Sequence, residues 1–100
     1  AVAARDDSGG LIDAGTDDQI LEAYRVLADK EGFFVEPSSA ASVAGLLQQA
    51  KRGLVDAGST IVCTVTGNGL KDTQWALESA KDPVVVPVDV KAAAAALGLA

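Results

Sequence analysis

The chain has 100 residues, a formal net charge of −6 at pH 7, one cysteine and no histidine. Because acidic side chains predominate and no basic patch is present, the composition argues against nucleic-acid binding. The residue types also exclude a disulfide framework and the common zinc sites within the chain, so we expect no metal site. Aromatic residues make up only 4% and methionine is absent, so alanine and valine must fill most of one small core.

The N-terminal segment carries no signal-peptide pattern, and the longest apolar run is far short of a membrane span. We therefore expect no membrane association and a cytoplasmic, reducing setting. Residues 1–4 predict the tail of a strand, residues 8–10 a turn, and residues 11–12 a short extended piece.

A first helix is predicted to begin after Thr16 and to end at Gly32. Thr16 and Gln19 have the spacing of a capping box, and Gly32 is the residue expected just beyond the helix end. Apolar residues recur along this segment at helical spacing, at Ile20, Leu21, Tyr24, Leu27 and Ala28. Residues 33–35, two phenylalanines and a valine, then predict a short buried strand.

A second helix is predicted to start at Pro37 and Ser38 or Ser39 and to end at Gly53. Its inward-facing residues are predicted to be Ala40, Val43, Ala44, Leu47 and Ala50. Residues 57–59 turn the chain into a β-branched run at residues 60–65, a pattern typical of a buried strand.

A third helix is predicted to follow Asp72 or Thr73 and to end before Pro83. Residues 84–86 are consecutive valines and predict another short strand. Asp89 is placed to cap a final alanine-rich helix.

This alternation of helices and strands predicts the α/β fold class, with a layered open parallel sheet and flanking helices joined by right-handed crossovers. We expect residues 1–100 to form a single α/β unit. In open parallel sheets, ligands bind beyond the carboxyl ends of the strands, which is where Thr66 follows residues 60–65. The segment VEPSSAAS at residues 35–42 can face the same crevice.

Thr66 is the candidate binding residue with the clearest chemistry. Its hydroxyl can both donate and accept, so it can pair with a heterocyclic ring nitrogen without fixing the protonation state of that nitrogen. The alternative is a turn residue whose hydroxyl binds nearby backbone. Gly67 and Gly69 form a GxG pattern without the third glycine of a dinucleotide fingerprint, since Asp72 occupies that position. The pattern requires only that the backbone turns tightly or passes close to another group.

Glu36 lies at the mouth of the predicted sheet, where a carboxylate can be desolvated and functional. It can equally cap the helix start by accepting backbone N–H groups. We expect Ser38, Ser39 and Ser42 to be caps rather than catalytic groups, and Cys63 to be a small buried side chain rather than a nucleophile. No base–nucleophile pair and no metal-ligand cluster can be assembled from these residues.

Two motifs of the chain resemble those of a known family. The segments GFFVEPSSAASVAGLL and STIVCTVTGNGLKD resemble the C-terminal part of the threonine synthases, which are pyridoxal-phosphate enzymes of the tryptophan-synthase-β fold group. The segment SGGLIDAGTDDQILEAYRVLADKEG is similar to the part of that family that comes before, and PVVVPVDVKAAAAALGLA matches its ending more loosely. The resemblance thus covers nearly the whole chain.

The resemblance implies the C-terminal part of a larger fold type II domain that uses pyridoxal 5′-phosphate. The family converts O-phospho-L-homoserine and water into L-threonine and phosphate. By resemblance, Thr66 hydrogen-bonds the pyridine nitrogen of the coenzyme and Glu36 lies close to the coenzyme ring. Gly67 is expected to be the third cofactor-binding residue, with a role in shaping the backbone. A homodimer of the full-length enzyme is also expected from the family.

The chain departs from the family pattern in two respects. The Schiff-base lysine and the phosphate-binding loop of the family have no counterpart here, so we expect no catalytic residue in this chain and no activity from it alone. Asn68 stands where relatives often carry histidine. Related threonine or serine dehydratases and cysteine synthases remain alternatives, as does a non-catalytic α/β fragment that binds a small anion or a partner chain.

Overall fold

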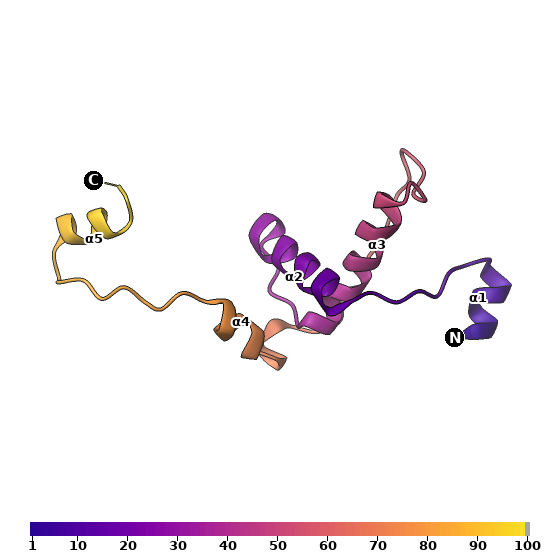
Figure 1. Cartoon of the computed structure of the whole chain (residues 1–100), viewed down its shortest axis with the longest axis horizontal. Coiled ribbons are helices and arrows are strands. Elements are labelled where there is room, and N and C mark those ends of the chain that lie inside the picture. Colours follow the sequence, from indigo (N-terminus) through magenta and orange to yellow (C-terminus); the bar gives the residue numbers. More distant parts are fainter. Residues whose placement is uncertain (100) are drawn as a thin grey trace.

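The computed structural model describes residues 1–99 as a set of helices joined by irregular segments (Figure 1). The elements in chain order are α1 (Val2–Ser8), α2 (Asp17–Glu31), the 3₁₀ helix η1 (Pro37–Ala40), α3 (Ala41–Lys51), the 3₁₀ turn η2 (Gly69–Lys71), α4 (Gln74–Ser79) and α5 (Val90–Ala96). Helices α2, η1 and α3 pack against one another at the centre of the molecule. Helix α1 lies at one end of the molecule and α5 at the other.

Helix α2 forms where its terminal residues predict. The Thr16 Oγ1 accepts a hydrogen bond from the Gln19 N–H at 3.3 Å, and the Gln19 Oε1 accepts one from the Thr16 N–H at 2.9 Å. These two bonds complete the predicted capping box. Gly32 ends the helix with a φ of 72°, a left-handed conformation that suits glycine. The predictions of this helix and of both its ends are confirmed.

A small core lies where α2 packs against η1 and α3. Its buried apolar side chains are Ala23, Tyr24, Leu27, Val35, Ala40 and Ala44. Alanine supplies much of this core, as the composition predicts, and its small side chains let the helix backbones approach closely. At the surface, the Lys51 ammonium donates to both carboxylate oxygens of Glu22 at 3.3 Å and joins α3 to α2.

The later helices are also close to their predicted positions. Helix α3 is followed by Gly53 with a φ of 72°, and the Asp89 Oδ1 accepts from the Ala92 N–H at 2.8 Å at the start of α5. Helix α4 begins after Thr73 as predicted, but the Thr73 side chain makes no capping hydrogen bond there.

The predicted strands are absent from residues 1–99, so the structure does not confirm the layered parallel sheet, which stays a prediction. Within the described part, no second strand pairs with residues 60–65 or 84–86. The Val62 and Val85 side chains are 87% and 94% exposed. A strand is stable only when neighbouring backbone completes its hydrogen bonds and covers one of its faces, and β-branched composition cannot supply that neighbour.

The predicted strand at residues 33–35 and the predicted strand tail at residues 1–4 differ from the structure in other ways. Of residues 33–35 only Val35 is buried, whereas Phe33 is 61% exposed. A single antiparallel bridge joins Val35 to Asn68. Residues 2–4 lie in the first turn of α1, and Ala1 is its N-cap, where the sequence predicts a strand tail. Alanine favours a helix and needs no partner strand.

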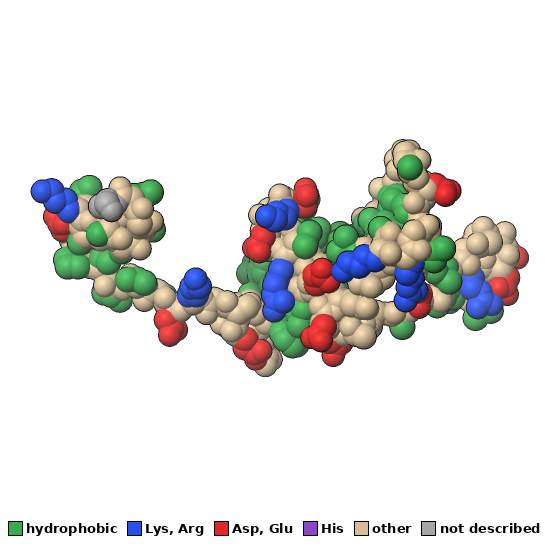
Figure 2. Space-filling view, turned by 45° about the horizontal axis from the view of Figure 1, so that its top comes forward, with side chains coloured by type: hydrophobic (Ala, Val, Ile, Leu, Met, Phe, Trp, Pro, Cys, Tyr) green, Lys and Arg blue, Asp and Glu red, His purple; other side chains and the backbone are tan. Residues whose placement is uncertain are grey.

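The molecule is elongated rather than compact. Its principal extents are 63 × 30 × 19 Å and its radius of gyration is 18.9 Å, against about 13 Å for a compact domain of this length. Hydrophobic side chains lie on the surface around α5, as Figure 2 shows. Among them, Val88 and Val90 are fully or largely exposed. No helix among residues 1–99 has both the length and the apolar composition that crossing a bilayer requires.

Candidate functional site

Two segments far apart in sequence meet beside the core and form the candidate site. The Glu36 N–H donates to the Gly67 carbonyl oxygen at 3.0 Å, and the Gly69 N–H donates to the Phe34 carbonyl oxygen at 3.1 Å. These bonds flank the Val35 bridge and hold the two segments antiparallel. The three predicted coenzyme-binding residues, Glu36, Thr66 and Gly67, are thereby brought into one place.

Ser39 links all three of these residues through its hydroxyl group. The Ser39 Oγ accepts from the Gly67 N–H at 2.6 Å, lies 3.1 Å from the Thr66 Oγ1, and donates to the Glu36 Oε1 at 3.3 Å. Ser39 is only 5% exposed. A buried hydroxyl with several polar partners holds its neighbours in fixed positions, because each broken bond would leave a polar group unsatisfied.

The structure corrects the predicted roles of these polar side chains. The Glu36 carboxylate accepts no backbone N–H at the start of η1, so it is not the helix cap that was one of its two predicted roles. The Ser39 and Ser42 side chains are not caps either. The Thr66 hydroxyl contacts the Ser39 hydroxyl rather than nearby backbone. Sequence reasoning missed the linking role of Ser39, since nothing in the sequence connects it to a threonine 27 positions away.

Close approach explains the two glycines of the TGNG motif. A Cβ atom added to Gly67 would overlap the Glu36 side chain and lie 2.6 Å from its Cγ. A Cβ atom added to Gly69 would lie 2.5–2.6 Å from carbons of the Phe34 ring. Neither glycine has a positive φ. Of the two predicted reasons for glycine here, close approach is therefore the correct one.

A cleft of about 930 Å³ opens beside this site, and we call it the Thr66 cleft. Its lining residues include Thr66, Gly67 and Asn68, and most of the others are apolar, such as Phe34 and Val43. Thr66 is exposed toward this space, whereas Glu36 is half-buried behind it and is not among the lining residues. No lysine or arginine of residues 1–99 lines the cleft. The cleft thus offers a ligand the neutral Thr66 hydroxyl, the acidic Glu31 side chain and a largely apolar wall.

Ser42 holds the segment that leads to Thr66. Its hydroxyl donates to the Thr64 carbonyl oxygen at 3.0 Å and fixes residues 60–65 against the start of α3. Cys63 on this segment is half-buried, with its Sγ 4.0 Å from the Ser42 carbonyl oxygen. The prediction of a fully buried cysteine is therefore only partly met.

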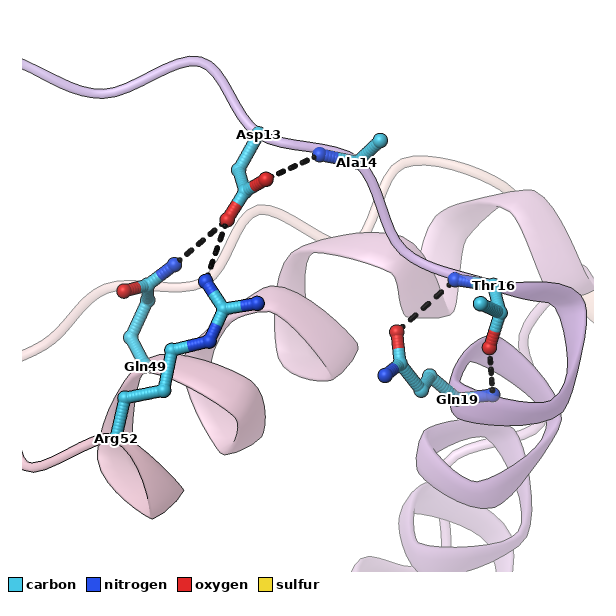
Figure 3. A network of polar contacts seen from close by, with 6 residues as sticks. All are labelled: Asp13, Ala14, Thr16, Gln19, Gln49 and Arg52. Atoms are coloured by element: carbon cyan, nitrogen blue, oxygen red, sulfur yellow. Dashed lines mark hydrogen bonds and ion pairs between the residues drawn. The ribbon is translucent and has the colours of Figure 1, made fainter.

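A second polar cluster lies away from the cleft and has a structural role (Figure 3). The Asp13 carboxylate accepts from the Ala14 N–H at 2.9 Å, from Gln49 at 3.0 Å and from Arg52 at 3.0 Å. The bond from the Ala14 N–H and then the Arg52 guanidinium lower the pKa of Asp13 below its ordinary value. This cluster ties the segment that enters α2 to the end of α3. No group of three or more potential metal-ligating side chains occurs within residues 1–99.

Comparison with known proteins identifies the family. Residues 1–67 match the family described as pyridoxal-phosphate dependent enzymes. The chain belongs to this family. The matched part ends at Gly67 and includes Glu36, Ser39 and Thr66. The cofactor expected from the resemblance is thus that of the family.

Individual members of the pyridoxal-phosphate dependent enzymes are similar over the whole chain. The chain is 53% identical to the threonine synthase of Mycobacterium tuberculosis H37Rv over 100 residues, which are 100% of this chain and 28% of that protein. It is 52% identical to the Mycobacterium leprae threonine synthase over 99 residues, covering 99% of this chain and 28% of that protein. It is 50% identical to the Halalkalibacterium halodurans threonine synthase over 93 residues, covering 92% and 26% respectively.

These matches confirm the resemblance inferred from the two motifs. The chain spans somewhat more than a quarter of the length of the threonine synthases that it matches, at 28% of the mycobacterial proteins. The roles of Thr66, Glu36 and Gly67 toward a coenzyme stay predictions.

Proposed function

We propose that the chain is the C-terminal part of a threonine synthase, which converts O-phospho-L-homoserine and water into L-threonine and phosphate with pyridoxal 5′-phosphate. Identity of about half over the whole chain to proteins of that name supports this activity. The observation that carries the proposal is the Thr66 hydroxyl, which the buried Ser39 holds at the edge of an apolar cleft.

The residues of the Thr66 cleft fit the ring of this coenzyme. When bound, the coenzyme supplies an electron sink for elimination and hydration of the substrate. In the proposal, Thr66 faces the pyridine nitrogen, the Gly67 backbone lies beside the ring, and the Phe34 and Val43 side chains exclude water. Glu36 acts from behind, through Ser39.

The lysine that holds the coenzyme and the loop that binds its phosphate come, in this proposal, from the remaining length present in the relatives. The same length would supply the missing neighbours of residues 60–65 and complete a layered open parallel sheet with flanking helices. The exposed β-branched side chains and the anchoring of Thr64 by Ser42 support this placement. We further propose that residues 1–100 act as one α/β unit of that catalytic domain, in a cytoplasmic homodimer.

A chimera tests the proposed activity. The matched 28% of the M. tuberculosis enzyme is replaced by this chain, and formation of threonine and phosphate from O-phospho-L-homoserine is measured. We expect a coenzyme-loaded, active chimera. A coenzyme-loaded chimera that forms no threonine from O-phospho-L-homoserine, but releases ammonia when given threonine, would instead identify a dehydratase.

The isolated chain provides the complementary test. We expect no shift in the coenzyme absorbance when pyridoxal phosphate is added to it. A borohydride-reducible adduct at one specific lysine would contradict the assignment of the reactive lysine to another part of the enzyme.

A further inference from the structure

A cavity apart from the Thr66 cleft lies between α2 and α4. Its volume is about 270 Å³, just below the usual range of ligand pockets, about 300–1,000 Å³, so it suits a small molecule. The residues that line it from the two helices are Leu21, Tyr24, Arg25, Trp75, Glu78 and Ser79. None of them lines the Thr66 cleft, so this is a separate space.

Two opposite charges border the cavity without pairing. Arg25 forms no ion pair with an acidic side chain of residues 1–99, whereas Arg5 and Arg52 each pair with an aspartate. Glu78 lines the same cavity, and its Oε1 accepts a hydrogen bond at 2.8 Å from Gln74 rather than from Arg25. Because the guanidinium and the carboxylate are too far apart to bind each other, a ligand that carries both charges can lie between them.

The Tyr24 hydroxyl is a third polar group at this cavity. Tyr24 is only 7% exposed, and a phenol buried to this degree usually has a hydrogen-bond partner. Within residues 1–99, no polar side-chain atom of a buried or half-buried residue is both enclosed and unpartnered. The Tyr24 oxygen forms no hydrogen bond there, so it opens onto the space that Tyr24 lines and is available to a ligand.

An adjoining cavity of about 370 Å³ adds a second carboxylate. It shares Tyr24, Arg25 and Ser79 with the first cavity, and Asp29 also lines it without pairing with Arg25. Carboxylates thus outnumber the single guanidinium. This balance disfavours a simple anion and favours a ligand that also carries a positive charge.

We propose that the space between α2 and α4 is a binding site for a free amino acid with an apolar side chain. The Arg25 guanidinium and the Tyr24 hydroxyl bind its carboxylate, and the Glu78 carboxylate binds its ammonium group. The Trp75 ring and the Leu21 side chain cover its apolar part. The site holds none of the residues assigned to the coenzyme, so this inference does not rest on the proposed function.

The fluorescence of Trp75 tests the proposal directly, because it is the only tryptophan of the chain and lines the cavity. When L-leucine is titrated into the chain, we expect a saturable change in emission with a Kd on the order of 1 mM. Arg25→Gln and Glu78→Gln should each weaken binding about 10-fold, since each removes a hydrogen bond to a charged group. Arg5→Gln removes the same charge away from the cavity and should leave the Kd unchanged.

Two analogues of L-leucine separate its charges without any substitution in the protein. Isocaproate lacks the ammonium group and isoamylamine lacks the carboxylate, and each should bind about 10-fold more weakly than L-leucine. Glu78→Gln should not weaken isocaproate binding further, and Arg25→Gln should not weaken isoamylamine binding further. Emission that stays unchanged at L-leucine concentrations well above the expected Kd overturns the proposal. An equal Kd in Arg25→Gln, or isocaproate binding as tight as that of L-leucine, overturns it as well.

Discussion

Replacing Gly67 with alanine tests whether close approach of the two segments holds the candidate site together. The added Cβ would overlap the Glu36 side chain, and it would lie 2.6 Å from the Cγ, well inside van der Waals contact. Because the Cγ lies near the backbone, rotation of the carboxylate alone cannot make room. Either the whole Glu36 side chain adopts another rotamer, which breaks its bond with Ser39, or the two segments separate, which weakens the Glu36-to-Gly67 backbone bond and the 2.6 Å bond to Ser39. Overpacking of this kind costs about 1–3 kcal/mol, and each lost hydrogen bond adds about 1 kcal/mol.

Urea unfolding followed by far-UV circular dichroism measures this cost, and Gly45→Ala is the matched control. A Cβ at Gly45 would meet nothing within 4 Å, and Gly45 lies within α3. Alanine there should stabilise the chain by about 0.5–1 kcal/mol, since it is the better helix former. We therefore expect opposite signs for the two substitutions. A Gly67→Ala variant as stable as the unmutated chain would refute the reasoning.

Three further changes probe separate features. In the complete enzyme, Thr66→Val should retain the coenzyme but lower kcat about 2- to 10-fold, since a typical hydrogen bond contributes about 0.5–1.5 kcal/mol, and an unchanged kcat would rule out the role at the ring nitrogen. Thr16→Ala removes the side-chain half of the capping box and should lower the urea midpoint by an amount worth about 0.5–2 kcal/mol, whereas an unaltered midpoint would show that the cap does not hold α2. The pKa of Asp13 is lower in the folded chain than the ordinary aspartate pKa of about 3.9, so the ionised carboxylate stabilises the fold at pH values above that ordinary pKa. This stabilisation is lost as the pH falls through the lowered pKa. In Arg52→Ala, NMR titration should show the Asp13 pKa rising part of the way toward the ordinary aspartate value, because the hydrogen bond from the Ala14 N–H remains. No rise at all would exclude the guanidinium as a cause of the lowered pKa.

The helices were predictable because the groups that form them are close in sequence. Thr16 and Gln19 lie three positions apart and satisfy each other regardless of the rest of the fold. Residues 60–65 have an equally strong pattern, yet a strand depends on a neighbour that the sequence of the strand does not contain. Val62, at 87% exposed, shows the result when that neighbour is missing.

The candidate site shows the same division between local and distant information. Glu36 and Thr66 could be singled out from the sequence because each is a polar residue that directly follows a run of mainly apolar residues. Their connection could not be predicted, since it depends on Ser39, which looks like a helix cap in the sequence. Only the packing of η1 against the TGNG turn shows that this serine faces the threonine.

The two unpaired valine-rich segments differ in their tendency to self-associate. Unpaired β-branched segments are templates for intermolecular sheets, and proline or charge at their borders prevents such pairing. Residues 84–86 are enclosed by Pro83 and Pro87, which remove amide donors from both sides of the run. Residues 60–65 have neither proline nor charge, and among residues 1–99 their backbone is held to the neighbouring helix only by the hydroxyl of Ser42. Aggregation of the isolated chain should therefore begin at residues 60–65, and a single lysine in place of the exposed Val62 should suppress it.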